Sequence, residues 1–446
     1  MKGFKIAVTG DSIINRRISV QQDPGFLSLV NVLRNADVSY THFESNIHDY
    51  DGPEVYPAAE AGWTWMRSPR FVADELKWAG FDMVSHASNH CLDYSYGGLF
   101  STWKALDEAG LVHAGTGRNL GEAREPKYLE TPKGRVALIS MSSTFTGWAR
   151  AGETRQDVKG RPGLNPLRYY YSADRTIIET VKDLAYKMGW GIANNRKEWY
   201  FNPPGLMMAI QRFVERDEPG ITTVVDEDDA VGNLKAIKEA ARQADHVIVA
   251  LHSHEMHPEK GLNVPAEFVQ SFAKSCIDAG ASVFVGQGSH APLRGIEIYN
   301  GKPIFYDPGD FFAMSSTVTR LPADFFARPG YAPELKNGHA TTADGFDARD
   351  ALPKPLNPPG GHFAVKVFGS IIPVCTFNEA GEFTELVLYP VTMDHKPRST
   401  GGIPRLAEGE LGEQIIEYLG ELSAPFGTRV EYSDGKGLIR LKHPVK

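Results

Sequence analysis

The sequence predicts an α/β fold, because short apolar strands alternate with amphipathic helices over most of the chain. Its 446 residues exceed the usual size of one domain, so we expect one large elaborated domain or two domains. The hydrophobic content of 42% and the charged content of 23% are typical of a soluble globular protein. A net charge of −8 gives no basic field that would attract nucleic acid or an anionic membrane.

The first 145 residues carry the clearest alternation. Helices are predicted where apolar residues recur at helical spacing, and strands where short apolar runs are bounded by polar residues. In chain order we predict a strand over 5–9, a helix over 26–35, a strand over 38–43, a helix over 69–79, a strand over 81–86, a helix over 96–109 and a strand over 136–141. This order favours layers of helices packed on sheets.

Residues 146–235 interrupt the alternation and are too many for a plain loop. We expect an inserted subdomain or lid here, with a helix near 174–188. The segment is rich in aromatic residues, such as the run Trp199 to Phe201. Either these residues form a separate small core, or some of them line a substrate cleft.

Alternation resumes after the insertion. We predict a helix over 229–243, a strand over 247–251, a helix over 265–279, a strand over 282–286, a hairpin over 296–306, a surface excursion over 315–360, a second hairpin over 363–391 and a helix over 408–422. The expected organisation is therefore a core of 1–145 and 236–395, an insertion of 146–235, and a C-terminal extension of 396–446 packed on the core.

Targeting signals and cysteine usage point to the cytoplasm. The N-terminal apolar run, Ile6 to Val8, is too short for a signal peptide, and no stretch approaches the 18 apolar residues of a membrane span. Three widely spaced cysteines, Cys91, Cys276 and Cys375, predict neither a disulfide framework nor a zinc ribbon. We expect no membrane anchor and no nucleic-acid partner.

Polar side chains suited to metal binding or acid–base chemistry follow five predicted strands. Ligands bind beyond the carboxyl ends of strands in open α/β sheets, so these side chains should meet in one pocket. They are Asp11; His42 and Glu44; Asn89 and His90; His252 and His254; and His290. Carboxylate, amide oxygen and imidazole are the usual ligands of manganese, iron or zinc.

Three arginines lie near these positions in the sequence. Arg16 and Arg17 come soon after Asp11, and Arg294 comes soon after His290. We expect them to bind an acidic group of the substrate.

Long ordered motifs connect the chain to a known family. The runs SNHCLDYSYGG (88–98), DHVIVALHSHE (245–255) and VFVGQGSH followed by IEIYNGKPIFYDPGDF (283–311) resemble segments of CapA/PgsA-type proteins. These proteins are named for capsular poly-γ-glutamate synthesis and are similar to calcineurin-like metallophosphatases. The resemblance covers most of 5–145 and 244–312. It implies a two-sheet α/β sandwich with a metal site between the sheets.

The resemblance also implies roles, position by position. The matching residues are Asp11 (first metal-binding or catalytic Asp), Glu44 (the Glu of a family motif), Asn89 (amide ligand), His90 (acid or base), and His252 and His290 (the histidines of the later segments). Other positions depart from the family pattern, namely Ile13, His42, Gln287, Gly288 and Asp310. The changes at Ile13, Gln287 and Gly288 remove ligands of a full two-metal centre, and His42, His254 and Asp310 are candidates to replace them. A divalent ion (Mn, Zn, Fe, Mg or Ca), a single-metal site and a metal-free acid–base site all stay open.

Three functions are compatible with these residues. The first is a metal-dependent hydrolase of an amide, peptide-like or phosphoester substrate, in which His90 protonates the leaving group. The second is a peptide epimerase that uses Asp11 and His290 as an acid–base pair without catalytic metal, as the resemblance allows. The third is a non-catalytic protein of polymer biosynthesis. The expected partner is a small peptide-like or acidic substrate, and the sequence does not predict the oligomeric state.

Overall fold

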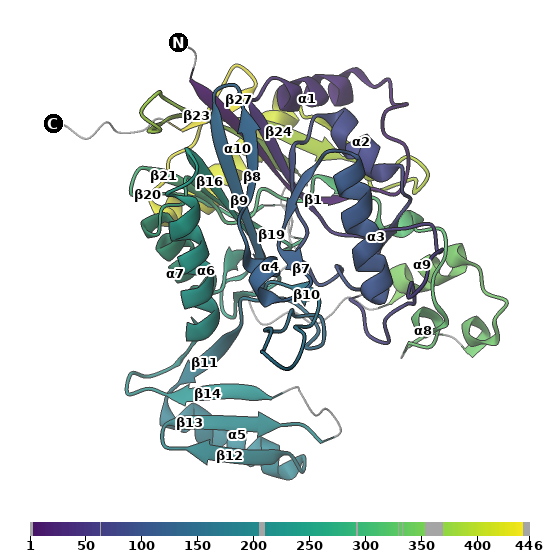
Figure 1. Ribbon diagram of the computed structural model, residues 1–446, viewed down its shortest axis with the longest axis vertical. Helices are drawn as coiled ribbons and strands as arrows, with labels where there is room; N and C mark the ends of the chain where they lie inside the picture. Colours follow the sequence, from purple (N-terminus) through teal and green to yellow (C-terminus); the bar gives the residue numbers. More distant parts are fainter. Residues whose placement is uncertain are drawn as a thin grey trace.

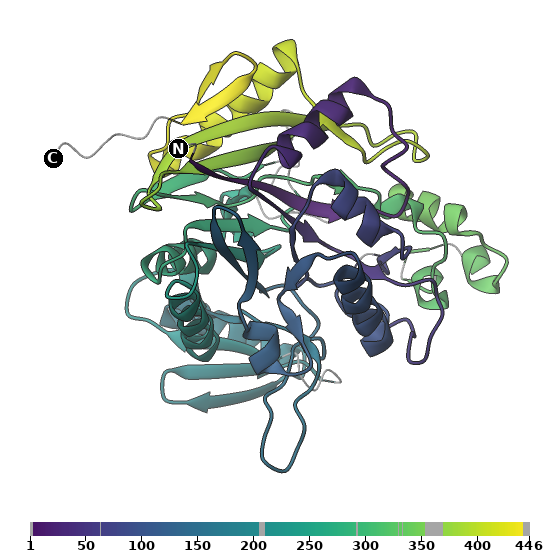
Figure 2. The same ribbon diagram turned by 45° about the horizontal axis from the view of Figure 1, so that its top comes forward.

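The computed structural model describes residues 3–62, 64–204, 210–290, 293–328, 330–331, 333–352 and 369–439. Two large sheets face each other, helices cover their outer faces, and a smaller third sheet projects from one end (Figures 1 and 2). The predicted α/β sandwich with an insertion is therefore confirmed.

The first large sheet contains ten strands. Its order is β26 (Glu431–Ser433), β27 (Lys436–Ile439), β24 (Phe383–Met393), β23 (Ser370–Phe377), β1 (Phe4–Ile13), β2 (Val38–Phe43), β5 (Met83–Ser85) and β6 (Val112–Ala114), with β22 (Phe312–Ala313) beside β1 and β25 (Pro404–Leu406) beside β24. Strands β1, β2, β5 and β6 pair in parallel, so their carboxyl ends meet at one edge.

The second large sheet contains six strands. Its order is β20 (Ile296–Tyr299), β21 (Lys302–Phe305), β19 (Val283–Gln287), β16 (His246–His252), β9 (Gly134–Ser142) and β8 (Lys127–Thr131). Strands β9, β16, β19 and β21 are parallel to their neighbours in this group. The inner faces of the two sheets share one apolar core, which includes Val8 and Tyr40 from the first sheet and Ile248 and Val285 from the second.

Helices cover the outside of the sandwich. Those on the first sheet are α1 (Pro24–Arg34), α2 (Val72–Ala79) and α3 (Ser95–Glu108), and those on the second are α6 (Glu227–Ala240) and α7 (Glu267–Asp278). Local signals set their ends: the Asp23 side chain accepts a hydrogen bond from the Phe26 amide at the start of α1, and Gly80 closes α2 with a φ of 104°. The C-terminal helix α10 (Gly409–Ser423) packs Ile415, Ile416 and Leu419 onto the central core.

Short elements complete the core. They are β3 (Asn46–Ile47), β4 (Arg67–Ser68), β7 (Thr116–Gly117), β10 (Gly163–Leu164), α4 (Leu120–Arg124), β17 (Met256–His257), β18 (Gly261–Pro265) and the 3₁₀ turn Ala424–Phe426. Among the described residues, no helix has both the length and the apolar content that crossing a bilayer requires.

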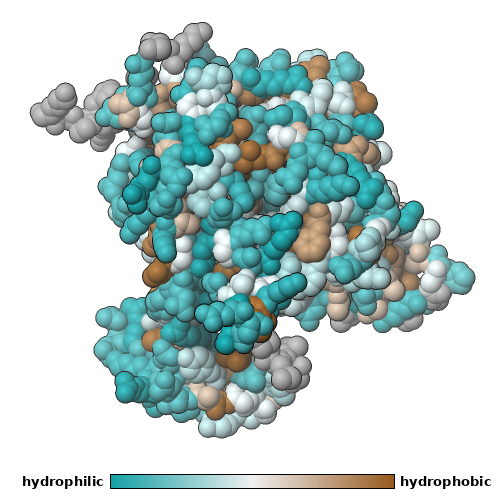
Figure 3. Space-filling model, viewed as in Figure 1, coloured by the Kyte–Doolittle hydropathy of each residue, from teal (hydrophilic) through white to brown (hydrophobic). Residues whose placement is uncertain are grey.

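The inserted sheet spans fewer residues than the segment expected over 146–235, because its strands begin at Tyr169 and end at Val225. Its order is β12 (Gly191–Asn195), β13 (Glu198–Asn202), β14 (Gln211–Glu215), β11 (Tyr169–Ala173) and β15 (Ile221–Val225), and helix α5 (Arg175–Lys187) packs on it. Its aromatic residues Trp199, Phe201 and Phe213 pack together with Ile178 in a small separate core. Figure 3 shows this insertion as a lobe whose visible surface is mostly hydrophilic.

Residues 315–352 differ from the plain surface excursion that their composition predicts. They contain α8 (Ala323–Phe326), α9 (Thr342–Ala351) and the 3₁₀ turns Ser315–Thr317 and Pro333–Asn337. Phe325 and Phe346 are buried and pack in one cluster with Trp65 and Tyr94. This packing places the segment beside the carboxyl ends of the strands. Residues 353–360 of the expected excursion, and 363–368 of the expected hairpin, lie outside the described residues.

Candidate active site

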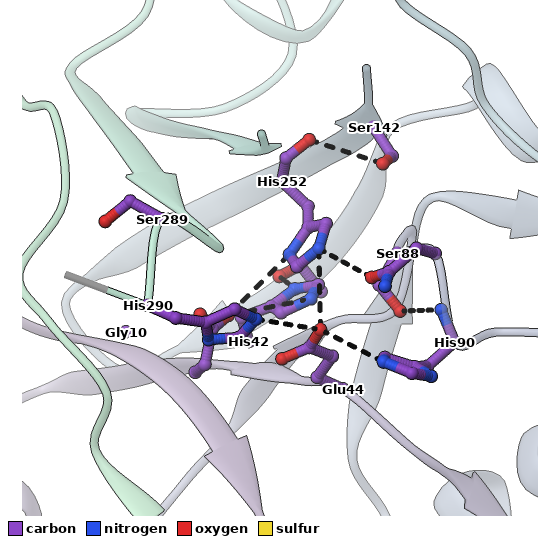
Figure 4. A network of polar contacts seen from close by, with 12 residues as sticks. Gly10, His42, Glu44, Ser88, His90, Ser142, His252, Ser289 and His290 are labelled. Carbon is purple, nitrogen blue, oxygen red and sulfur yellow. Dashed lines mark hydrogen bonds and ion pairs between the residues drawn. The ribbon is translucent and has the colours of Figure 1, made fainter. Parts of the chain in front are cut away.

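The five predicted strand ends meet at one place between the two sheets (Figure 4). Asp11 lies in β1, His42 lies in β2 with Glu44 just beyond it, and Asn89 and His90 lie in the turn between β5 and α3. From the second sheet, His252 ends β16, His254 follows it, and His290 follows β19. Parallel strands of both sheets thus deliver these side chains to the same edge.

Two buried carboxylates form the centre of the cluster. The Oδ1 atom of Asp11 lies 3.7 Å from Nδ1 of His252 and 3.9 Å from Nε2 of His42. The Oε1 atom of Glu44 lies 3.5 Å from Nε2 of His252 and 3.7 Å from Nε2 of His290. His252 therefore stands between the two carboxylates.

No hydrogen bond from the described residues reaches any of the four oxygens of Asp11 and Glu44, although all four are buried. Nε2 of His42 and Nδ1 of His252 are buried without a described partner as well. A buried carboxylate without donors costs free energy unless it binds a cation or takes up a proton. The centre therefore has the donor set and the unsatisfied oxygens that a metal ion requires.

The pKa shifts in the cluster agree with a metal-binding centre. Burial, reinforced by the charge of Glu44, raises the pKa of Asp11 well above its usual value, and burial likewise raises the pKa of Glu44. Burial lowers the pKa of His42, His252 and His254 well below the usual value, so these rings are neutral. Neutral imidazoles can offer a lone pair to a metal ion.

Three sets of described residues offer ligand atoms that lie within 4.8 Å of one another. They are Asp11, His42 and His252; Glu44, His252 and His254; and Asp11, His290 and Asp310. Asn89 lies beside the second set, because its Oδ1 is 2.9 Å from Nε2 of His252. Carboxylate, imidazole and amide oxygen together are typical of manganese, iron or zinc sites.

Ser85 fixes the orientation of His42. Its hydroxyl lies 2.7 Å from Nδ1 of His42 and 2.6 Å from the hydroxyl of Tyr40. The other ring nitrogen of His42 is thereby turned toward Asp11. Such partners of ligating histidines set the ring orientation in metal sites.

His90 pairs with a carboxylate that sequence reasoning missed. Its Nδ1 donates to Oδ2 of Asp93 at 2.6 Å, and its Nε2 lies 3.8 Å from Oε1 of Glu44. Burial lowers the pKa of His90, but Asp93, with a smaller contribution from Glu44, more than offsets this effect, and the pKa lies above the usual value. The His90-x-x-Asp93 spacing was the signal that could have identified the pair.

His290 is held by Asp310 at the carboxyl end of the second sheet. Nδ1 of His290 lies 3.2 Å from Oδ1 of Asp310, and the His290 backbone adopts a φ of 47°. Gly10 lets the loop that contains Gly309 and Asp310 approach β1, because a Cβ at position 10 would lie 2.0 Å from the carbonyl oxygen of Gly309. The close approach brings Asp310 next to Asp11.

The departure at Gly288 has a steric reason. Gly288 has a φ of 98°, and a Cβ there would lie 2.7 Å from Cε1 of His252. The ring of His252 thus occupies the space that a side chain at position 288 would need. Ile13, another departure from the family pattern, contributes an apolar side chain to the wall of the pocket.

A cavity of about 470 Å³ opens onto this centre. Glu44, Asn89, His90, His254, His290 and Asp310 line its reactive part. The other walls come from Thr64 and Met66, from 313–317, and from Arg349, Asp350, His395, Lys396, Arg398 and Gly401. The described residues of this lining include none from the inserted sheet.

The three arginines expected to bind substrate lie elsewhere. Arg294 is buried, and its guanidinium donates to the carbonyl oxygens of Leu262 and Glu255. Arg16 donates to carbonyl oxygens of the 398–401 loop, and Arg17 pairs with Glu75. Proximity in sequence was misleading, because the described lining of the cavity includes none of the three arginines.

Comparison with known proteins gives matches over nearly the whole chain. Residues 5–315 match the family model described as "Bacterial capsule synthesis protein PGA_cap". The protein y4sH of Sinorhizobium fredii is 32% identical over 98% of this chain and 93% of its own length. The capsule biosynthesis protein CapA of Bacillus anthracis is 25% identical over 53% of this chain, but over only 41% of its own length.

Two further matches are more limited. The PGA biosynthesis protein CapA of Bacillus subtilis is 25% identical over 55% of this chain and 46% of its own length. Among solved structures, a 5′-nucleotidase precursor from Thermus thermophilus aligns with a TM-score of 0.33 and 10% identity, over 87% of this chain and 54% of that one.

Proposed function

Because the chain belongs to the PGA_cap family of bacterial capsule synthesis proteins, we propose that it is a metal-dependent hydrolase of an amide or peptide-like substrate. The substrate class is suggested by the names of its relatives, which refer to PGA biosynthesis and, in a Mycobacterium tuberculosis protein, to polyglutamine synthesis. A phosphoester is the second substrate class that the same side chains could serve.

One observation carries the proposal. Asp11 and Glu44 bury four carboxylate oxygens that receive no hydrogen bond from the described residues, and the neutral imidazoles of His42, His252 and His254 lie in the same cluster. A purely structural site would pair these oxygens with donors. Asp11, His42, Glu44, Asn89, His252 and His254 would hold the ion, and His290 with Asp310 stands at its edge. When bound, a divalent ion activates water and polarises a carbonyl or phosphoryl oxygen.

His90 is the proposed general acid. Oδ2 of Asp93 accepts a hydrogen bond from Nδ1–H, so Nε2 is the atom that exchanges a proton with the substrate. A raised pKa keeps the ring protonated at higher pH than a free histidine, which suits a group that protonates an amine leaving group. His90 also lines the cavity, where it can reach a bound substrate.

The epimerase alternative is less well supported. It requires Asp11 and His290 on opposite faces of one substrate carbon. Instead, both contribute ligand atoms to one set within 4.8 Å, together with Asp310. A non-catalytic role does not require buried carboxylates without hydrogen-bond donors beside an open cavity.

The test uses the full chain purified without a histidine tag. We expect bound Mn, Fe or Zn by elemental analysis, and release of new amines from α- and γ-linked glutamyl peptides by mass spectrometry. D11N should lose both metal and activity, whereas D157N, which neutralises an exposed carboxylate, should lose neither. Hydrolysis that survives a chelator, in protein without metal, would overturn the proposal. Deuterium uptake at a substrate α-carbon without hydrolysis would favour the epimerase.

A further inference from the structure

The cavity has a second wall whose chemistry differs from that of the histidine cluster. Arg349, Lys396 and Arg398 line it, together with the hydroxyl-bearing segment Ser315–Thr317. The three cationic residues lie beyond position 315, outside the part of the chain that matches the family model. The histidine cluster lies within the residues that match the family model, whereas the three cationic residues of this wall follow them in the sequence.

Arg349 is held in a fixed orientation. Its Nη1 donates to Oγ1 of Thr64 at 3.0 Å, and its Nη2 donates to Oγ of Ser316 at 2.7 Å. The guanidinium also lies over the ring of Phe346, with 4.9 Å from Cζ to the ring centroid. The charged guanidinium also donates from Nε and Nη2 to Oδ1 of Asp350, at 3.4 and 3.2 Å, so the second hydrogen of Nη1 is the donor that the described contacts leave for a ligand. The side chain is only 18% exposed, so this charge is directed into the cavity rather than dispersed in bulk water.

The carboxylates nearby do not cancel the cationic charge. Asp350 is shared, because Oδ1 lies 3.2 Å from Nη2 of Arg349 and Oδ2 lies 2.7 Å from Nη2 of Arg398. Asp347 pairs with Arg398 at 2.7 Å. The exposed ammonium of Lys396 adds a third cation to the wall. Three cations facing two carboxylates leave a net positive charge.

The loop that carries Lys396 and Arg398 is held in place by hydrogen bonds from Arg16. The guanidinium of Arg16 donates to the carbonyl oxygens of Arg398, Ser399 and Gly401. A preorganised loop presents Lys396 and Arg398 at little entropic cost when a ligand binds. Arg16 thus supports this wall without lining it.

We propose that this wall is an oxyanion subsite, in which Arg349 directly binds a carboxylate or phosphate that the substrate carries away from the bond to be cut. The inference rests on the proposed hydrolase function and narrows its substrate class to amides that bear an anionic group. Arginine suits the role because its guanidinium stays charged, and its remaining Nη1 hydrogen can donate a charge-assisted hydrogen bond to an oxygen of such a group.

The first test compares three hydroxamate probes on the metal-loaded full chain by calorimetry. One is glutaric acid monohydroxamate, and the others carry a carboxamide or a phosphonate in place of the terminal carboxylate. We expect an anionic probe to bind about tenfold more tightly than the carboxamide probe, as one hydrogen bond to a charged group allows. The anionic probe that binds better identifies the group as carboxylate or phosphate.

Variants assign the effect to the subsite. R349Q should abolish the preference for the anionic probes while leaving carboxamide binding unchanged, and R349K should retain part of it. R242Q, which removes an 81% exposed arginine on the outside, should change nothing. Equal binding of all three probes to the unmodified protein would overturn the subsite and leave the hydrolase proposal standing. If R349Q does not fold, an R349K preference as large as that of the unmodified protein would count against a contact specific to the guanidinium of Arg349.

A metal-free measurement separates the two proposals. With chelator present, inorganic phosphate should raise the melting temperature of the unmodified chain more than that of R349Q or R349K. The absence of that difference would overturn the subsite, whether or not the protein binds a metal. Failure of all hydroxamates to bind, with the phosphate difference intact, would contradict only the hydrolase proposal.

Discussion

Nδ1 of His90 donates to Oδ2 of Asp93 at 2.6 Å, and Asp93 accepts a second hydrogen bond at 2.6 Å from the backbone amide of Met66. Both side chains are buried, and the free nitrogen of His90 faces Glu44. Asp93 thus sets which nitrogen of His90 carries the exchangeable proton, and it raises the pKa of the ring.

Replacing Asp93 by Asn should impair His90 without removing it. The neutral amide no longer stabilises the protonated ring, so the pKa of His90 should fall, and activity should fall roughly 10- to 100-fold, as for other partners of site histidines. The pKa is measured by NMR titration of the histidine ring protons. D107N is the matched control, because Asp107 pairs with His113 at 3.1 Å outside the cavity. An unchanged His90 titration in D93N would contradict the assigned role of Asp93.

Replacing Glu44 by Gln should stabilise the metal-free protein at pH 8. Burial raises the pKa of Glu44, so its stabilising contribution is present below its unfolded-state pKa and is lost as pH rises through the folded-state pKa. At pH 8 in chelator the buried charge is a cost that Gln removes, and unfolding should require roughly 1 kcal/mol more. E44Q should also lose the stabilisation that added metal gives the unmodified protein.

Glu75 provides the opposite control for E44Q. Its carboxylate is also buried, but it accepts hydrogen bonds from the amides of Ile18 and Ser19 and from the Ser19 hydroxyl. E75Q should therefore destabilise the protein, as measured by urea denaturation in chelator. If E44Q destabilised it to the same extent, Glu44 would be a structural residue rather than a ligand.

Much of the fold could be predicted from local sequence signals. The strand predicted over 38–43 has these same bounds as β2, and the helix predicted over 408–422 differs from α10 by one residue at each end. Such elements follow from periodicity and from glycine or proline at their ends, which are local properties. The meeting of Asp11, Glu44 and His252 was predictable as well, because parallel strands align their carboxyl ends.

Contacts made across long sequence distances could not be predicted. Arg349 reaches Thr64 and Ser316, and it does so only because Phe325 and Phe346 pack the 315–352 segment onto the core. Composition alone gave that segment the appearance of a surface excursion. Arg294 shows the converse error: it lies near His290 in sequence, but it is buried against the carbonyl groups of another loop.

Replacing Gly288 by Ala should weaken metal binding. The new Cβ would lie 2.7 Å from Cε1 of His252, so the ring must move away from Asp11 or Glu44. G301A is the matched control, because Gly301 also has a positive φ, of 70°, but no described atom lies within 4 Å of its Cβ position. Both variants should lose roughly 1–2 kcal/mol from backbone strain, but only G288A should lose metal affinity by calorimetry. Equal affinities in the two variants would show that His252 is not confined in this way.

The stability of the metal-free protein should fall as the pH drops below about 6.5. Burial lowers the pKa of His86 from 6.5 to about 4, and Nε2 of this ring lies 3.0 Å from the carbonyl oxygen of Ser45. A lowered folded-state pKa means that the unfolded chain binds the proton first, so stability is present above pH 6.5 and is lost between pH 6.5 and 4. For His86 alone this loss amounts to about 2 kcal/mol at pH 5. Urea denaturation of the unmodified protein and of H86Q in chelator, at pH 7.5 and pH 5, measures this loss.

H86Q should show a smaller pH dependence of stability by this amount, since Gln can keep the hydrogen bond to Ser45 without titrating. H113Q should reduce the pH dependence by less than H86Q does, because the exposed Asp107 partly offsets the lowering of the pKa of His113 by burial. If H86Q and the unmodified protein lost equal stability between the two pH values, the pKa of His86 would not be lowered by burial in the folded protein.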